Sequence, residues 1–217
     1  MFSNGVKGVA SATSTERARS RSSKGSGQKL RQELIDAAAD LLVKARPVAP
    51  PSLRQIARTC GVAASAVYMH FDSVEQLIAA VVSQQFNSLR TALAEVADPV
   101  ADPRAAIDAA AVAYSRWAAQ QPGAYQLLFE RPDIDVPPGG VGPGEDLLAA
   151  FGKPLHALGF TERAASDMAL LLWQIVHGIT SLRLHKTSAP WTRTAEQDLA
   201  RAVAAILADH ETGRGAD

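Results

Sequence analysis

The stretch that decides the fold is Ser52 to Phe71, which reads S-L-R-Q-I-A-R-T-C-G-V-A-A-S-A-V-Y-M-H-F. Its first part carries apolar side chains at helical spacing, namely Leu53, Ile56 and Ala57. The hydroxyl of Ser52 suits the N-cap of this helix. Gly61 is expected to end it in a left-handed turn, because glycine adopts that conformation at little steric cost.

A second short helix is predicted from about Ala64, with Val67 and Phe71 directed into the core. A small residue, then a glycine, then apolar residues at fixed offsets are typical of a helix-turn-helix, although an ordinary helical hairpin can share the pattern. The outward-facing side chains are mostly small or hydrogen-bonding, as expected of a helix that lies in the major groove of DNA. They are Ser65, Ala66, Tyr68 and His70.

A wider set of motifs surrounds this stretch. A helix is predicted from Gln28 to Lys44 with one apolar stripe, and D-S-V-E-Q-L-I-A-A-V opens a long helix after Phe71. From Gln28 to Val82 the chain resembles the TetR family of regulators. The resemblance implies a DNA-binding surface whose candidate residues are Ser52, Arg54, Gln55, Ala63, Ser65, Ala66, Tyr68, His70 and Ser73.

Two positions depart from the family pattern. Val74 stands where the family often has a lysine that meets a phosphate, and Ala63 stands where serine or threonine is common. Both departures remove a phosphate contact without changing the fold. A protein-interaction module that has lost DNA binding therefore stays open as an alternative.

Charge is distributed unevenly along a chain whose formal net charge is zero. Residues 1–72 hold 11 Lys/Arg and 5 Asp/Glu, a balance of +6, whereas residues 73–217 hold 11 and 17, a balance of −6. This asymmetry favours a polyanionic partner at one end. Residues 1–27 are predicted to be a disordered basic arm, which either follows DNA or is a solvated tail.

The rest of the chain is predicted to be helical, so the fold class is all-α with about nine helices. A helix-turn-helix domain over 28–73 precedes a helical effector-binding and dimerisation domain over 74–210 and a disordered tail over 211–217. A mobile loop rich in proline and glycine is expected at 131–144. The expected helices of the second domain are 74–97, 103–120, a short helix ending at 129, 145–158, one after Thr161 that ends near 185, and one that starts at Thr194.

Several classes of function are disfavoured by composition. Cys60 is the single cysteine, so no intrachain disulfide and no zinc-thiolate site are expected, and no other metal or cofactor is predicted. No apolar run is long enough to span a membrane, which favours a soluble cytoplasmic protein. An all-α enzyme is the weakest alternative, because no nucleophile, metal or phosphate-loop motif occurs.

One helix of the second domain contains L-L-L-W-Q-I-V-H-G-I-T-S-L. Trp173 and His177 are four residues apart and so share a face. Gly178 costs about 1 kcal/mol relative to alanine in a helix, which suggests that a helix or a ligand approaches it closely. The segment resembles the W-H-G type of TetR effector domain. By that resemblance, this helix and the next form a dimer interface, and its opposite face borders a ligand pocket.

Aromatic residues gather in the second domain, where they form either a plain core or the lining of a cavity. The family resemblance favours a cavity for an apolar or aromatic effector. His177 is then either a polar contact of the ligand or a satisfied core residue. The candidate ligand-binding residues are Tyr114, Trp117, Tyr125, Phe129, Phe151, Trp173, Gln174 and His177.

These features together predict a ligand-responsive DNA-binding regulator. One recognition helix reads only a few base pairs, so a homodimer is expected to bind an inverted repeat in double-stranded DNA, with half-sites about 34–36 Å apart or more. Repression that a ligand releases is the commoner outcome in the family that the chain resembles.

Overall fold

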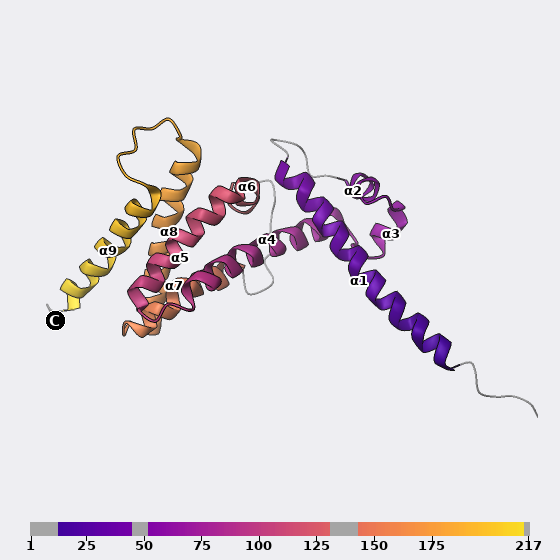
Figure 1. Cartoon of the computed structure of the whole chain (residues 1–217), viewed down its shortest axis with the longest axis horizontal. Helices are drawn as coiled ribbons and strands as arrows, with labels where there is room; N and C mark the ends of the chain where they lie inside the picture. Colours follow the sequence, from indigo (N-terminus) through magenta and orange to yellow (C-terminus); the bar gives the residue numbers. More distant parts are fainter. Residues whose placement is uncertain (1–12, 45–51, 131–142, 215–217) are drawn as a thin grey trace, which may run out of the picture. The chain divides into compact units, whose positions relative to one another are not determined.

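The structure is a computed structural model that describes residues 13–44, 52–130 and 143–214 (Figure 1). Within these ranges all regular elements are helices, and the predictions of an all-α class and of about nine helices are confirmed. In chain order they are α1 (Thr13–Lys44), α2 (Leu53–Thr59), α3 (Ala64–Tyr68), α4 (Val74–Ala97), α5 (Pro103–Gln120), α6 (Pro122–Phe129), α7 (Pro143–Ala157), α8 (Glu162–His185) and α9 (Ala195–Arg214).

The chain divides into two compact units, Met1–Leu77 and Ile78–Asp217. The division falls inside the first turns of α4, whereas the sequence places a boundary just before that helix. Because α4 is one continuous helix across this division, it contributes residues to both units.

The core of the first unit is formed where α2 packs against both α1 and α3. The hydroxyl of Ser52 accepts a hydrogen bond from the Gln55 amide at 3.3 Å and so caps α2, as predicted. Gly61 has a φ of 67°, the left-handed turn that separates α2 from α3. The buried apolar side chains are Leu34, Ile35, Ala38, Ala39, Leu42, Leu53, Ile56, Ala57, Val67, Phe71 and Leu77.

Two predicted disordered segments are partly helical. α1 begins at Thr13 rather than at Gln28, and α9 continues to Arg214 although a tail was expected from 211. Once a helix is nucleated, each added residue gains one backbone hydrogen bond. Both helices can therefore extend past their apolar stripes. Residues 1–12 and 215–217 lie outside the described residues, as do residues 131–142 of the loop predicted over 131–144. The last two residues of that predicted loop, Pro143 and Gly144, belong to α7.

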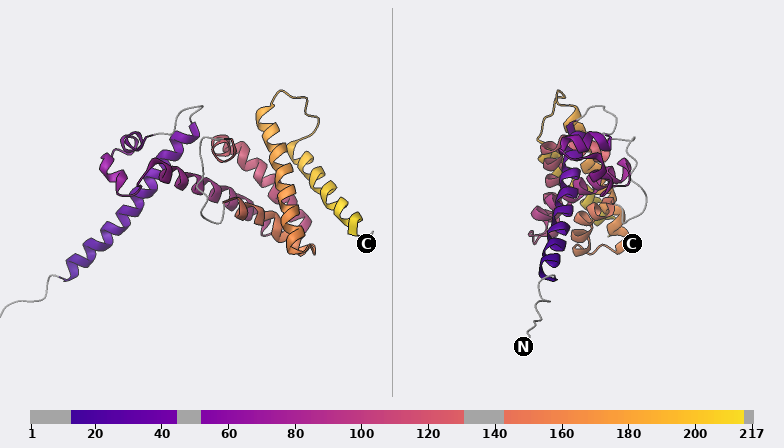
Figure 2. Two further views of the ribbon diagram at one scale, coloured as in Figure 1. Left: turned by 180° about the vertical axis from the view of Figure 1, so that it is seen from behind. Right: turned by 90° about the vertical axis from the view of Figure 1, so that its right-hand side faces the viewer.

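In the second unit α5 is the central helix. It packs against α6, α7, α8 and α9, and the views in Figures 1 and 2 agree in placing α8 and α9 beside it. Asp102 caps α5 by accepting hydrogen bonds from the Arg104 and Ala105 backbone amides, and Pro103 occupies the first helical position, where its missing N–H costs nothing. Its buried residues are Ala106, Ile107, Ala110, Ala111, Ala113, Tyr114, Trp117 and Ala118.

Local signals also set the ends of the last helices. Gly159, at φ 86°, follows α7, and Thr161 caps α8 through its side chain. Thr194 precedes α9 and accepts a hydrogen bond from the Gln197 amide at 3.1 Å. No described helix combines the length and the apolar character needed to cross a bilayer.

Candidate functional sites

The candidate DNA-binding surface is centred on α3. Ser65 is exposed, and Tyr68 and Met69 expose 55% and 82% of their surface. Val67 and Phe71, in contrast, are almost fully buried. The prediction that α3 turns Val67 and Phe71 inward is therefore confirmed, and the exposed side chains stand on a helix fixed to the core.

The backbone that follows α3 is held by two hydrogen bonds. The amides of His70 and Phe71 both donate to the Val67 carbonyl, at 2.9 and 3.0 Å. The guanidinium of Arg31 on α1 lies 5.0 Å from the centre of the Phe71 ring, a cation–π distance. These contacts hold the backbone directly after Tyr68 and Met69.

The other DNA-binding candidates have mixed environments. Arg54, Gln55 and Ala63 are exposed, and Ala66 and His70 are half-buried. The hydroxyls of Ser52 and Ser73 accept hydrogen bonds from the Gln55 and Gln76 amides, so both act as caps. A hydroxyl that accepts in a cap still has a proton to donate, which leaves both serines able to contact a phosphate.

One residue of this surface was absent from the sequence candidates. Met69 is the most exposed large apolar side chain in the described residues. It follows α3 directly, in a stretch where helical periodicity no longer determines which side chains face outward.

A second candidate site is an aromatic cluster around His177 of α8. The hydroxyl of Tyr114 lies 2.9 Å from His177 Nδ1, and that of Tyr125 lies 3.2 Å from the same nitrogen. The Tyr125 ring stacks on the imidazole at a centroid distance of 5.5 Å. The rings of Phe129 and Trp173 lie 5.2 and 5.6 Å from it. The cluster thus joins α5, α6 and α8.

Burial controls the protonation of this cluster. It lowers the pKa of His177, an effect that the charge of Glu130 partly offsets, so the imidazole is neutral near pH 7. Burial raises the pKa of Tyr125 to about 12 and raises that of Tyr114 further. The Tyr125 hydroxyl also lies 3.4 Å from His177 Nε2. A neutral imidazole has one donor and one acceptor nitrogen, so each nitrogen can have one neutral hydroxyl as its partner.

Two further contacts extend the cluster. Phe86 of α4 meets Phe129 edge-on at 5.9 Å, so the cluster reaches α4. Glu130 pairs with His185 Nε2 at 3.2 Å, which places a carboxylate beside the rings. Neither residue was a sequence candidate, because nothing in the local pattern relates them to His177.

Trp173 contributes a polar atom to the cluster. Its indole N–H is buried and makes no hydrogen bond of normal geometry among the described residues. It is nevertheless close enough to the Tyr114 hydroxyl to favour the ionised form and so to lower its pKa, against the larger effect of burial. This N–H is a donor that a ligand could satisfy.

The structure places three predicted ligand residues differently. Gln174 is exposed, so it does not face the rings. Trp117 donates from Nε1 to Ser88 Oγ at 3.1 Å. Phe151 lies on α7 and is buried, but it is not among the rings found around His177. The five predicted residues that come together are Tyr114, Tyr125, Phe129, Trp173 and His177.

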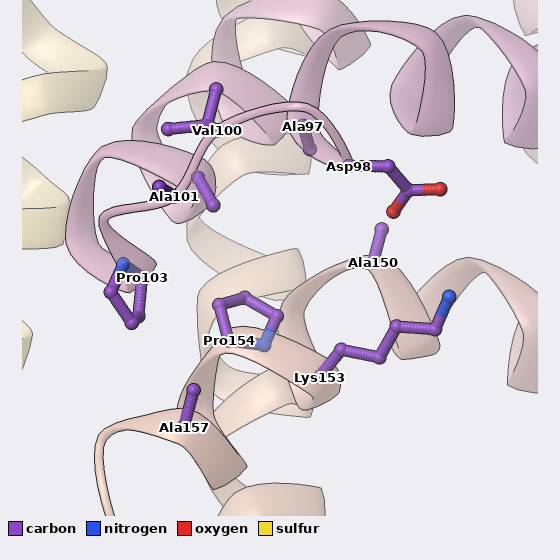
Figure 3. Close-up of a pocket in the computed structure, with 10 residues that line it drawn as sticks. Ala97, Asp98, Val100, Ala101, Pro103, Ala150, Lys153, Pro154 and Ala157 are labelled. Atoms are coloured by element: carbon purple, nitrogen blue, oxygen red, sulfur yellow. The ribbon is translucent and has the colours of Figure 1, made fainter.

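Two described pockets lie apart from the cluster. Figure 3 shows one of about 230 Å³, where small apolar side chains at the α4–α5 corner face α7, with Asp98 and Lys153 at its edge. The other, about 550 Å³, runs between α7 and α8 beside Gly152. No cluster residue lines either pocket, so neither is the aromatic-lined cavity that the sequence predicts.

An apolar face of α8 is open to solvent. Leu170, Leu171 and Leu182 expose 42%, 41% and 51% of their surface. On the same helix, a Cβ added to Gly178 would meet nothing within 4 Å. The close approach that Gly178 suggests is therefore not made by this chain's described residues.

Comparisons with known proteins agree with both units. Residues 34–81 match a family model described as bacterial regulatory proteins, tetR family. Residues 107–209 match a model described as tetracyclin repressor-like, C-terminal domain. Together the two models cover most of the chain.

Solved structures share the fold. The crystal structure of the protein SCO4313 aligns with a TM-score of 0.68 at 21% identity, over 85% of this chain and 98% of that one. A tetR-family transcriptional regulator from Streptomyces coelicolor aligns with 0.64 at 19% identity, over 83% and 81%. The TetR family regulator PfmR from Thermus thermophilus aligns with 0.55 at 17% identity, over 80% and 96%.

Proposed function

Because the chain belongs to the TetR family of DNA-binding transcriptional regulators, we propose that it is a ligand-responsive repressor. A homodimer binds an inverted-repeat operator, and an apolar or aromatic effector releases it. The proposal places the protein in the cytoplasm with bacterial DNA. The main supporting observation is the exposed surface of α3. Tyr68 is exposed there, while Val67 and Phe71 are buried beneath it and are linked by a backbone hydrogen bond.

The DNA-binding step uses side chains of different character. Tyr68 and Ser65 offer hydroxyl groups to bases or phosphates, and Arg54 and Gln55 on α2 offer donors to the phosphate backbone. The positive charge balance of residues 1–72 attracts the duplex to this unit. Neither Ala63 nor Val74 supplies the polar contact usual in the family, so Arg54 and Gln55 carry more of the phosphate binding.

The dimerisation step uses the open face of α8. Leu171, Gly178 and Leu182 are spaced seven and four residues apart and share one side of the helix. A second copy that packs on this face covers the exposed leucines, and its backbone can approach closely at Gly178. Packing of the second copy against Gly178 would offset the roughly 1 kcal/mol that a glycine costs inside a helix relative to alanine.

The effector step uses the cluster around His177. Its rings favour an apolar or aromatic ligand, and the buried Trp173 N–H favours one with a hydrogen-bond acceptor. Phe129 contacts Phe86 on α4, the helix that starts directly after Ser73. A ligand that shifts Phe129 therefore acts on α4, and it biases DNA binding by its differential affinity for two conformers.

Footprinting of the full-length protein on its own upstream DNA tests the main proposal. We expect protection of two half-sites related by a two-fold axis. A lack of binding to any inverted repeat, at low as well as moderate salt, would favour the alternative of an interaction module.

The effector step has a separate test. A screen of hydrophobic small molecules should find compounds that raise the melting temperature and lower operator affinity. Trp173→Phe keeps the ring but removes the N–H, so it should weaken both effects. Trp191→Phe is the matched control, because its N–H donates to the Lys186 carbonyl at 2.9 Å, outside the cluster.

A further inference from the structure

We propose that Met69 is a base-reading residue whose thioether side chain packs against the 5-methyl group of a thymine in the major groove of each half-site. The proposal rests on the DNA-binding function above and adds to it a residue that determines sequence preference. Among the described residues, Met69 has the most exposed large apolar side chain.

The exposure of Met69 is unusual for its surroundings. In the first unit, the large apolar side chains that are exposed among the described residues are Tyr68 and Met69. The apolar neighbours Val67 and Phe71 are almost completely buried. The surface could have presented a polar residue at position 69 at no cost to the core, since the side chain contributes nothing to it.

The position of Met69 suits contact with base edges. Met69 comes directly after α3 and next to Tyr68, on the surface that also carries Ser65. The amides of His70 and Phe71 are both bonded to the Val67 carbonyl, which fixes the backbone on the C-terminal side of Met69. The side chain itself is unbranched and flexible, so it can adapt to a shallow apolar surface.

The chemistry of methionine selects the target. Its thioether has no hydrogen-bond donor and only a weak acceptor, so it is poorly suited to recognise the polar edges of guanine, adenine or cytosine. It carries no charge and cannot bind a phosphate. The apolar feature that distinguishes one base in the major groove is the thymine methyl group.

Uracil substitution tests this contact directly, because uracil lacks only that methyl. The operator found by footprinting is synthesised with single thymines replaced by uracil, and the dissociation constant of the full-length protein is measured for each. At one thymine position of the half-site we expect wild-type binding to weaken about three- to fourfold, the loss expected for one apolar carbon. The substitution should weaken Met69→Gln binding by less than about 1.5-fold, since the amide makes no comparable apolar contact.

Two variants act as matched controls. Met69→Leu keeps an apolar side chain and should retain most of the uracil effect. Tyr68→Phe keeps Met69 and should retain it fully. The Met69 variants should keep the wild-type melting temperature and helix content, because the side chain is 82% exposed.

The possible failures are distinguishable. Operator binding that is indifferent to uracil at every thymine overturns the role of Met69 and leaves the DNA-binding function in place. A uracil effect equally large in Met69→Gln also overturns it, since another residue then contacts the methyl. If no DNA binds at all, the proposed function fails and the role of Met69 fails with it.

Discussion

The exposed apolar side chains of the two units differ in number and setting. Among the described residues of the first unit, the large ones are Tyr68 and Met69, adjacent to each other at the end of a five-residue helix. In the second, Val96 and Trp191 are exposed singly, whereas Leu170, Leu171 and Leu182 are spread over three turns of α8. A narrow patch among polar and basic side chains suits a duplex edge, whereas a broad apolar face suits another protein surface.

The difference shows how one chain can serve two kinds of partner. A contact with DNA gains affinity from charge and specificity from a few side chains, so little apolar surface needs to be exposed. A dimer interface gains affinity mainly from apolar burial, so a whole helix face is required. The two surfaces should therefore respond differently to substitution.

The largest effect is expected when the α8 face is made charged. The double variant Leu171→Glu and Leu182→Glu should dissociate the dimer and weaken operator binding about 100-fold or more, because two linked half-site contacts become separate events. Sedimentation and gel shift measure the two effects. Val96→Glu, at a 43% exposed apolar position on α4, should leave both unchanged. A dimeric double variant would contradict the assignment of this face.

A smaller effect is expected at the DNA-binding surface. Tyr68→Ala should weaken operator binding about five- to thirtyfold, which corresponds to about 1–2 kcal/mol for one specific contact. Dimerisation and helix content should not change, because the side chain is 55% exposed. Equal affinity in the variant and the wild type would remove Tyr68 from the contact set.

A core substitution in the aromatic cluster should reduce stability without altering either surface. Tyr114→Phe removes a hydroxyl 2.9 Å from His177 and leaves no cavity. It should cost about 1 kcal/mol and lower the melting temperature by about 2–4 °C. Tyr68→Phe removes an exposed hydroxyl and should leave the melting temperature unchanged. If both variants melted alike, the buried hydrogen bond would contribute nothing to stability.

The smallest effect is a pH dependence. Burial lowers the pKa of His177 in the folded state below its ordinary value of 6.5. The unfolded chain then binds a proton more readily, so this contribution to stability is present above pH 6.5 and is lost as the pH falls toward the folded pKa. His177→Gln should therefore lose less stability than the wild type between about pH 7 and pH 5, as measured by melting temperature. An identical slope in both proteins would show that another group dominates.

Short-range features of the fold were predictable from the sequence. Ser52 was predicted as an N-cap, and its hydroxyl accepts a backbone hydrogen bond in that role. The side chains of Asp102 and Thr161 cap α5 and α8 in the same way. The left-handed turn at Gly61 was also predicted correctly. These features depend on interactions within four residues, which the sequence displays directly.

The extent of the end helices was not predictable in the same way. α1 begins 15 residues before the predicted start at Gln28. Residues 13–27 have no apolar stripe, and the predicted helix start relied on the apolar stripe that begins after Gln28. Once the following turns are helical, extension needs no apolar contact, so periodicity gives no signal of where it stops.

The membership of the ligand cluster was only partly predictable. Helical spacing placed Trp173 and His177 on one face, and both lie in the cluster. Gln174 is one residue from Trp173 and faces solvent instead. Phe86 on α4 and Glu130, which directly follows α6, also belong to the surroundings of the cluster. No local sequence pattern relates either residue to His177.

The sequence by itself determined where most helices begin and end, which side chains turn inward around Gly61, and the family to which the chain belongs. Only the tertiary structure decided which aromatic rings meet at His177, that Trp117 bonds Ser88 instead, and that Met69 is left exposed. The physical reason is one of range. Helix period and capping act between neighbours in the chain, whereas the environment of a helix face depends on helices that are distant in sequence and pack against it.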